Sequence, residues 1–395
     1  RAHQFREDGG PLAHPVRPAS FVEINNFYTV TVYEKGAEII GMLKRLVGDD
    51  GYKKALDLYF DRHDGDAATI EDWLQVFTDA TGRDLTQFAR WYAQAGTPRV
   101  SVQDSYEDGT YTLTLTQQTP PTPGQADKAA MLIPVAVGLL NDAGQEVVAT
   151  QILELAKPTQ SFTFEGLDSK PIPSILRGFS APVILEQAQT NAERAFLLAH
   201  DTDPFNRWDA GRTLAQDVLL RMVRQDTAPD AALLDGLAAV LRDDSLDPSF
   251  RALVLTLPSQ DDTAQALDAL GETPDPTAVY RAHESLTLQI AQHIQDTLPR
   301  IYADMTVTGA YSPDAIATGK RALGNRMLSL MSKIDGGKQA AQQYAQADNM
   351  TQQLAALASL LKIGKGADEL VAFEQQWQHD RLVMDKWFGL QVGSA

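Results

Sequence analysis

The segment from Arg90 to Leu115, RWYAQAGTPRVSVQDSYEDGTYTLTL, contains the change of hydrophobic period that decides the fold. Before it, apolar residues recur with the spacing of a helix, and after it they alternate with polar residues as in a strand. Between the two patterns lies Gly96-Thr97-Pro98, where Gly suits the residue after a helix and Pro cannot continue one. We therefore place a domain boundary between residues 97 and 98.

Residues 1 to 97 carry the helical pattern. A first helix is predicted from Tyr33 to Val47, because Ile39, Ile40, Leu43 and Leu46 fall on one face. A second is predicted from Tyr52 to Arg62. Thr69 begins a third, which continues through Phe77, in the pattern of a capping box. Asp84 to Ala95 is predicted to form a fourth.

Residues 98 to 186 have the period of β-strands. The apolar members of each predicted strand alternate with other residues, in the sets Tyr111, Leu113 and Leu115; Ile133, Val135, Val137 and Leu139; and Phe162 and Phe164. Turn sequences rich in Gly, Pro, Asn and Asp separate these runs. Short alternating strands with such turns predict a small β-sandwich.

Residues 187 to 395 are predicted to be helical. Four helix starts share one form, a capping residue followed by proline: Asp203-Pro204, Asp247-Pro248, Asp275-Pro276 and Ser312-Pro313. Short helices with short links indicate a solenoid-like array of antiparallel pairs, although no fixed repeat length is present. Such an array ends in a polar cap, whereas Leu382 to Phe388 is apolar and aromatic. We therefore expect the array to be truncated at its C-terminus, and the whole chain to be a multidomain α+β protein.

Length and composition agree with several soluble domains. A chain of 395 residues exceeds the roughly 100 to 200 residues of one domain, and 44% hydrophobic with 22% charged residues is typical of globular proteins. The net charge of −18, without a basic stripe, argues against nucleic acid as a partner. The longest apolar run, Met131 to Leu140, is shorter than the roughly 20 residues of a membrane-spanning helix.

The chain has no cysteine and does not begin with methionine. The first feature excludes disulfides and thiolate metal sites, and the first ten residues lack the apolar region of a signal peptide. We expect a cytoplasmic protein, and we interpret the sequence as a fragment or a processed product.

No zinc site is predicted within the chain. His283-Glu284 begins like the zinc-binding motif H-E-x-x-H, but Thr287 stands where the second histidine is required. A zinc-binding helix needs two imidazoles at positions i and i+4, and no histidine pair here has that spacing.

The stretch from Asn25 to Gly36, NNFYTVTVYEKG, is the strongest candidate for a functional site. Tyr28 and Tyr33 flank an extended run that leads into a helix, so a tyrosine hydroxyl at this junction could project into a cleft. On periodicity alone, a tyrosine that packs its ring and satisfies its hydroxyl locally is the more common case.

The residues Tyr28 to Glu38, YTVTVYEKGAE, resemble the segment that follows the zinc-binding helix in zinc aminopeptidases of the bacterial aminopeptidase N family. Further similarities occur in the same order along the chain, at residues 14–18 (HPVRP), 90–98 (RWYAQAGTP), 179–183 (FSAPV), 207–210 (RWDA) and 382–388 (LVMDKWF). The resemblance therefore covers nearly the whole chain.

The resemblance implies three domains. Residues 1–97 would be the helical end of a thermolysin-like catalytic domain, residues 98–186 the β-sandwich, and residues 187–395 most of the helical array. The family's H-E-x-x-H helix, its downstream glutamate ligand and its G-A-M-E-N motif are absent from these residues. Zinc would be the cofactor of the complete enzyme, with its ligands and general base outside this chain. The implied partners are peptide substrates and the missing N-terminal part.

The resemblance also implies roles for four residues. Tyr33 matches the tyrosine whose phenol stabilises the oxyanion formed during peptide hydrolysis, and a neutral phenol suits that task because it donates a hydrogen bond. Tyr28 and Asn25 would line the cleft beside the pocket for the N-terminal side chain. Glu34 would help to shape the same wall, or would serve only as an acid favoured at a helix start.

Two alternatives to an aminopeptidase remain open from the sequence. The first is a non-catalytic binding module made of the β-sandwich and the helical array. The second is a related epoxide-opening hydrolase that shares the tyrosine, although the match in the β-sandwich disfavours it. As part of an aminopeptidase, the chain alone is expected to be inactive and to bind no zinc.

Overall fold

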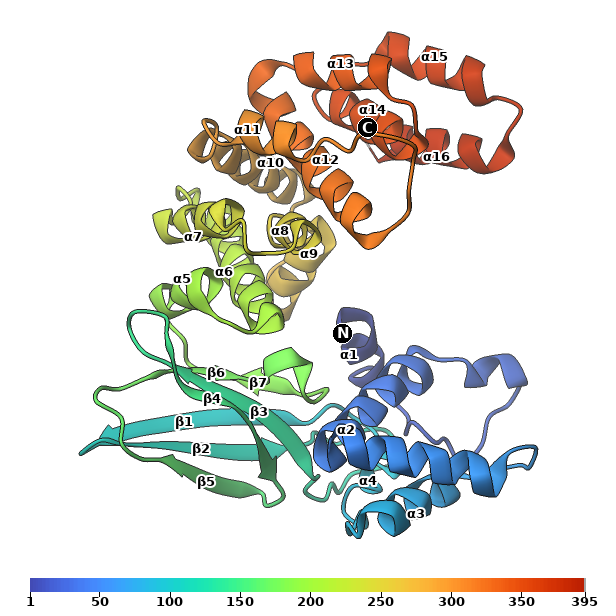
Figure 1. Ribbon diagram of the computed structural model, residues 1–395, viewed down its shortest axis with the longest axis vertical. Helices are drawn as coiled ribbons and strands as arrows, with labels where there is room; N and C mark the ends of the chain where they lie inside the picture. Colours follow the sequence, from blue (N-terminus) through green and yellow to red (C-terminus); the bar gives the residue numbers. More distant parts are fainter. Residues whose placement is uncertain (394–395) are drawn as a thin grey trace. The chain divides into compact units, whose positions relative to one another are not determined.

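The computed structural model describes residues 1–393, which form two compact units (Figure 1). The first unit comprises Arg1–Thr190 together with His200–Asn206, and the second comprises Asn191–Ala199 and the chain from Arg207 onward. The first unit contains both β-sheets, whereas the second is helical. The multidomain α+β class predicted from the sequence is therefore confirmed.

The strands form two sheets whose order along each sheet is β5-β2-β1-β7 and β4-β3-β6. Neighbouring strands are antiparallel, except that β1 pairs with β7 in parallel. The strands are β1 (Arg99–Glu107), β2 (Thr110–Gln118), β3 (Ile133–Leu140), β4 (Glu146–Leu155), β5 (Thr159–Phe164), β6 (Ile172–Ile175) and β7 (Ile184–Glu186).

Strand β2 shows how the alternating pattern is used. Tyr111, Leu113 and Leu115 are fully buried, while Thr114 and Thr116 face outward and pair with hydroxyls of β5. Strand β3 differs from the prediction, because all eight of its residues are buried. It is the central strand of its sheet and also contacts helical segments, so both of its faces are covered.

The helical part of the first unit consists of α1 (Ala2–Asp8), η1 (Ile24–Phe27), η2 (Thr31–Lys35), α2 (Gly36–His63), α3 (Ile70–Thr81) and α4 (Arg90–Ala93). Gly48 has φ 73° and breaks α2 into two helical stretches, which correspond to the two helices predicted there. Thr69 and Asp72 form the predicted capping box at the start of α3. That helix continues to Thr81, four residues beyond its predicted end.

The predicted fourth helix, from Asp84 to Ala95, is wrong in extent, because only α4 is helical there. Asp84 accepts a hydrogen bond from the backbone N–H of Thr86 at 2.9 Å, a local contact that competes with helix formation. Trp91 is fully buried, and its Nε1 donates to the carbonyl of Leu132 at 2.8 Å. Tertiary packing of this aromatic segment therefore replaces regular helix.

One hydrophobic core runs through the first unit. It joins residues of the helical part, such as Phe77 and Phe88, to Val100 and Tyr111 of the sheets. The helical part and the β-sandwich are consequently packed as one body, even though their sequence periods differ.

The second unit is built from helices α5 to α16. They are α5 (Asn191–His200), α6 (Pro204–Gln225), α7 (Ala231–Arg242), α8 (Pro248–Val254), α9 (Gln260–Ala269), α10 (Pro276–His293), α11 (Leu298–Asp304), α12 (Ala315–Asp335), α13 (Lys338–Gln346), α14 (Met350–Leu361), α15 (Ala367–Trp377) and α16 (Arg381–Val392). The last residue of α5, the turn that follows it and the first residues of α6, together His200–Asn206, are grouped with the first unit.

Asp247 and Asp275 cap helices that begin with proline, as predicted. The prediction for Ser312-Pro313 is wrong by two residues, because α12 begins at Ala315 and its cap is Asp314. The Asp314 carboxylate accepts from the backbone N–H of Ala317 at 2.9 Å, which is the bond that the serine was expected to supply.

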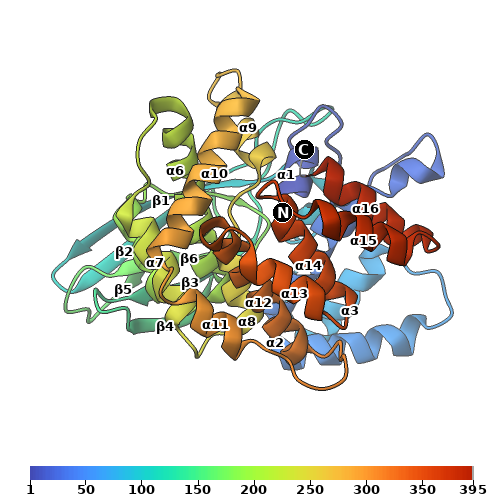
Figure 2. The same ribbon diagram turned by 90° about the horizontal axis from the view of Figure 1, so that it is seen from above.

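Close helix packing in the second unit depends on two glycines. Leu198 of α5 lies against Gly211 of α6 and Gly236 of α7, and a Cβ at either glycine would come within 2.7 Å of a Leu198 methyl group. Farther along, α15 and α16 lie side by side in both ribbon views (Figures 1 and 2). Sequential helices thus pack as neighbours, as the predicted array requires.

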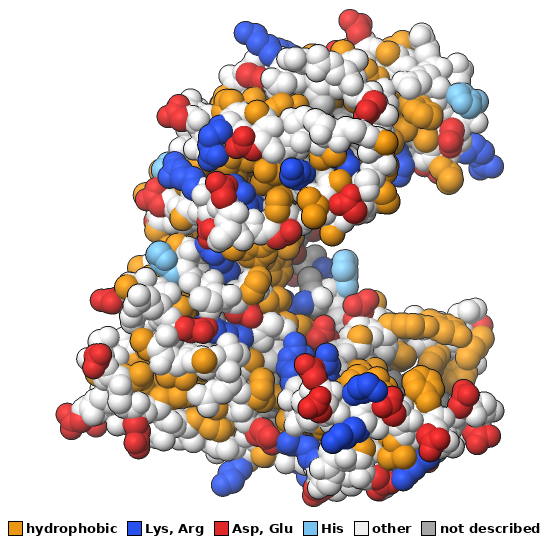
Figure 3. All heavy atoms as spheres, viewed as in Figure 1, with side chains coloured by type: hydrophobic (Ala, Val, Ile, Leu, Met, Phe, Trp, Pro, Cys, Tyr) orange, Lys and Arg blue, Asp and Glu red, His pale blue; other side chains and the backbone are white. Residues whose placement is uncertain are grey.

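Acidic and basic side chains are interspersed on the face shown in Figure 3. Within residues 1–393, no helix combines the length and apolar character needed to cross a bilayer.

Candidate functional site

Tyr28 and Tyr33 belong to a stretch of the first unit that contains two irregular helical turns. The 3₁₀ turn η1 ends at Phe27, and the π-helical turn η2 then leads directly into α2. The backbone N–H of Gly36 bonds to the carbonyl of Thr31, five residues earlier, which defines the wider turn. Such π turns within helices are frequent at functional sites. The predicted helix start near Tyr33 is therefore a π turn, and regular helix begins at Gly36.

The structure brings Tyr28 and Tyr33 together at the surface. Their ring centroids are 6.2 Å apart with an interplanar angle of 25°, so the rings are stacked. The two residues are 58% and 59% exposed, which is unusual for large aromatic residues. Both rings are consequently available to a ligand.

Asn25 and Glu34 are also exposed. The Asn25 amide donates to the Glu23 carboxylate at 2.8 Å, a local contact within the turn that precedes Tyr28. Glu34 follows Tyr33 in the first turn of the helical segment, the position at which an acid is favoured by the helix dipole.

A pocket of about 930 Å³ adjoins Tyr33 on the side of α2 and α3. Its lining is mainly apolar and aromatic, with an Arg17–Glu71 ion pair, and its size lies in the range of ligand pockets in proteins. Of the four residues predicted from the sequence, Tyr33 alone is among the lining residues, which include Val16, Phe27, Val32, Ile40, Tyr59, Trp73 and Tyr92.

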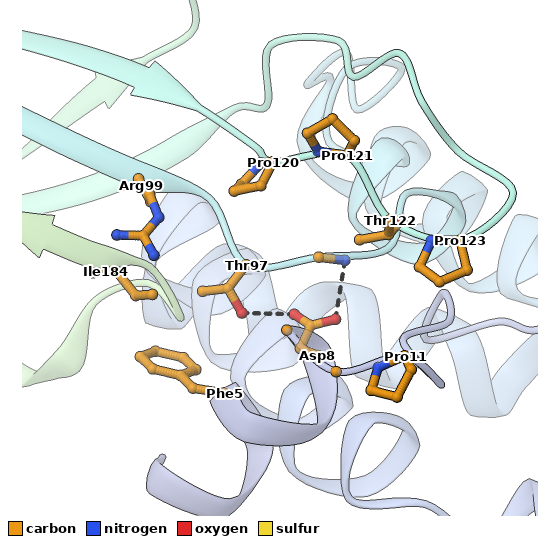
Figure 4. Close-up of a pocket in the computed structure, with 13 residues that line it drawn as sticks. Phe5, Asp8, Pro11, Thr97, Arg99, Pro120, Pro121, Thr122, Pro123 and Ile184 are labelled. Atoms are coloured by element: carbon orange, nitrogen blue, oxygen red, sulfur yellow. Dashed lines mark hydrogen bonds between the residues drawn. The ribbon is translucent and has the colours of Figure 1, made fainter. Parts of the chain in front are cut away.

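A buried ion pair fixes the end of the π turn. Lys35 Nζ donates to Asp8 Oδ2 at 2.7 Å and to the carbonyl of Gly96 at 3.0 Å, and both charged side chains are fully buried. Asp8 also accepts from the Gly96 N–H at 3.0 Å and from the Thr97 hydroxyl at 2.8 Å (Figure 4). Three distant segments are thereby joined two residues from Tyr33.

A second contact holds the start of the same turn. The Glu7 carboxylate accepts from the backbone N–H of Thr31 at 2.7 Å. Neighbouring acidic residues of α1 therefore support both ends of the turn that carries Tyr33. Burial lowers the pKa of Lys35, while the charge of Asp8 and its hydrogen bond oppose that effect.

The sequence prediction missed Lys35 and Asp8. A signal was present, because Lys35 precedes the buried Ile39 by four residues and therefore belongs to the buried face of the predicted helix. Nothing in the spacing connects that lysine to Asp8, which lies 27 residues earlier, so its partner could not be named.

Two histidines of the helical array have local partners rather than a metal arrangement. His283 is bonded through Nε2 to the Thr263 hydroxyl at 3.0 Å, and His293 pairs with Asp235 at 2.9 Å. Across residues 1–393, no three His, Cys, Asp or Glu side chains are grouped so that they could hold a metal ion. The side chains in this part of the chain do not fit a zinc centre.

Three family models match consecutive parts of the chain. Residues 1–92 match the peptidase family M1 domain, residues 96–188 match a domain of unknown function (DUF3458) with an Ig-like fold, and residues 191–395 match DUF3458_C, described as ARM repeats. The last of these covers more than half of the chain. Aminopeptidase N relatives align with essentially the whole chain.

The chain belongs to the DUF3458_C family and is homologous to part of aminopeptidase N.

The relatives include aminopeptidase N of Caulobacter vibrioides, which is 44% identical over 99% of this chain and 46% of its own length. Aminopeptidase N of Escherichia coli is 38% identical over 100% of this chain and 47% of its own length. A crystal structure of Legionella pneumophila aminopeptidase A in complex with aspartic acid matches 96% of this chain and 45% of its own, with 25% identity and a TM-score of 0.84. The chain therefore spans about half the length of the relatives it matches.

Proposed function

We propose that this chain is the part of a zinc-dependent aminopeptidase that supplies one wall of the active site. The complete enzyme would remove N-terminal residues from peptides in the cytoplasm, and zinc would be held by residues outside this chain. The homology to aminopeptidase N supports the activity, and the exposed Tyr33 beside a large pocket is the structural observation on which the residue assignment rests.

In this proposal Tyr33 donates a hydrogen bond to the substrate oxygen that becomes negatively charged when water attacks the peptide carbonyl. Such a bond accelerates the reaction because it strengthens as the charge develops. The π turn, held by Glu7 at its start and by the Asp8–Lys35 pair at its end, would keep the phenol in place. A donor that needs no rearrangement contributes most to the transition state.

Tyr28 would form the adjoining wall of the substrate site, since its ring stacks on Tyr33. We assign Asn25 and Glu34 to the same wall, with Asn25 acting through the turn before Tyr28 and Glu34 through its position beside Tyr33. Three domains, with boundaries near residues 98 and 186, also remain a proposal, which the extents of the three matched family domains support.

The proposal is tested by Tyr33→Phe in a longer polypeptide that contains this chain and has aminopeptidase activity. Removal of an oxyanion donor typically lowers kcat by about 10² to 10³-fold. The ring remains, so stability and zinc content should be unchanged, and KM should change less than kcat.

Tyr28→Phe is the matched control, because it removes the same hydroxyl from the stacked neighbour. We expect it to change KM or residue preference more than kcat. Normal turnover by Tyr33→Phe together with a nearly inactive Tyr28→Phe would mean that the two tyrosines have the opposite roles.

A further inference from the structure

A pocket of about 340 Å³ in the second unit is lined by three cationic side chains. Arg326 and Lys333 project from α12 with Ser329 between them, and Lys362 follows the last residue of α14. Helix α10 forms the opposite lining with residues at helical spacing, namely Tyr280, His283, Glu284 and Thr287.

The cations of this pocket are incompletely paired. Lys333 forms an ion pair with Glu284, the one acidic residue in the lining. Arg326 donates through Nη2 to the carbonyl of Leu255, but its buried Nε has no hydrogen-bond partner. Lys362 has neither an ion pair nor a side-chain hydrogen bond with any residue in the described range 1–393. Three positive charges thus face one negative charge.

This surplus of positive charge in the pocket contrasts with the chain as a whole, whose net charge is −18. Lys362 itself is exposed and its charge is solvated, but an unsatisfied buried N–H such as the Nε of Arg326 is rare in folded proteins. Partial burial lowers the pKa of Lys362, the charges of Arg326 and Lys333 lower it further, and the charge of Glu284 opposes this effect. An anion in the pocket would supply an acceptor for Arg326 and balance the surplus of positive charge.

The remaining polar groups of the lining suit an oxyanion. The Ser329 and Tyr280 hydroxyls and the Gln260 amide can donate hydrogen bonds into the pocket. The hydroxyl of Thr287 already donates to the His283 carbonyl at 2.8 Å, and the His283 ring is bonded to the Thr263 hydroxyl. Thr287 and His283 therefore stabilise the wall of the pocket. Most polar groups of the lining that remain available to a ligand can therefore donate a hydrogen bond.

We propose that this pocket binds a compact dianionic oxyanion of the phosphate class, held by Arg326, Lys333 and Lys362. A dianion matches the two uncompensated positive charges, and charge-assisted hydrogen bonds from guanidinium and ammonium groups are the usual means of phosphate recognition. The proposal concerns the second unit and is independent of the function assigned to Tyr33.

The test is isothermal titration calorimetry of the full 395-residue chain with inorganic phosphate, at constant ionic strength and at mildly alkaline pH. Sulfate serves as a second dianion and acetate as a monoanion. We expect phosphate and sulfate to bind at one site per chain, and acetate to bind at least tenfold more weakly. Absence of phosphate binding, or equal binding of acetate, would overturn the proposal.

Lys362→Gln identifies the site, because it removes a cation that has no ion pair and no side-chain hydrogen bond within the described residues and so should leave the fold intact. Hydrogen bonds to charged groups contribute about 1.5 to 3 kcal/mol, so phosphate affinity should fall roughly tenfold or more. Lys362→Arg keeps the charge and should retain binding. Lys338→Gln removes the same charge from an exposed position of α13 and should leave affinity unchanged. Equal phosphate affinity in Lys362→Gln and the unaltered chain would refute the assignment.

Discussion

Lys35→Met tests whether the buried ion pair holds the turn that carries Tyr33. The substitution keeps the length and apolar stem of the side chain but removes the ammonium that donates to Asp8 at 2.7 Å and to the Gly96 carbonyl at 3.0 Å. Asp8 would then be a fully buried carboxylate with two remaining donors, the Gly96 N–H and the Thr97 hydroxyl. Breaking one side of a buried pair costs about 3 to 5 kcal/mol.

Hydrogen exchange measured by mass spectrometry reports this loss of stability for the individual segments concerned. At about 1.4 kcal/mol per factor of ten, amide protection in residues 31–35 and 96–97 should fall roughly 10² to 10⁴-fold, or to the limit set by local opening. The double variant Lys35→Met with Asp8→Asn should recover much of the loss, because the amide oxygen can still accept from the Gly96 N–H while no charge is buried.

Lys44→Met, in the helix α2 that follows the turn, is the control. Its partner contact with Asp49, at 3.2 Å, is solvent exposed, so its loss should change protection by less than about tenfold. A similarly small effect of Lys35→Met, with the fold preserved, would refute the inference that a buried charge pair stabilises the turn.

Three further outcomes are expected. Gly236→Ala should lower the free energy of unfolding by about 1 to 3 kcal/mol in urea titrations, because its Cβ would lie 2.7 Å from Leu198, whereas Gly389→Ala, in a helix with open space, should be neutral or stabilising; equal effects would contradict the packing argument. Burial lowers the pKa of His283 below its ordinary 6.5, so the unfolded chain binds the extra proton first and stability should fall as the pH drops below about 6.5; His283→Asn should flatten that dependence in melting curves, and an unchanged curve would exclude this histidine as its source. Elemental analysis of the purified 395-residue chain should find no stoichiometric zinc, and one tightly held zinc per molecule would contradict the assignment of the metal ligands to another part of the enzyme.

Much of the fold could be predicted because periodicity reports which face of an element is buried. The alternation in Thr110–Gln118 and the capping box at Thr69 are local properties, and both appear in the structure as predicted. The helix expected from Asp84 to Ala95 was wrong because its short-range pattern competes with a local Asp84 turn and with burial of Trp91. Tertiary contacts determine the conformation of that segment, and helix propensity does not predict such contacts.

The candidate site was predictable only in part, for a related reason. The tyrosine motif identifies Tyr33, but the π turn on which it lies depends on the hydrogen bond that Glu7 accepts and on the ion pair that Asp8 forms, and both acids are distant in sequence. Likewise, the spacing of Arg326 and Lys333 indicates one helical face, whereas their nearness to Lys362 requires the packing of α12 with α14. A pattern in one element does not specify its partner in another.

The Asp8 network also has a consequence for synthesis of the chain on the ribosome. The Asp8 carboxylate cannot obtain its bond from the Gly96 N–H until 88 more residues have been added. At about 5 to 20 residues per second, that takes roughly 4 to 18 seconds. Once Lys35 has been added, it lacks its Gly96 acceptor for the next 61 residues and must remain hydrated. The nascent segment before α2 is therefore exposed to proteases and chaperones until residues 96 and 97 emerge, and translation speed sets the length of that exposure.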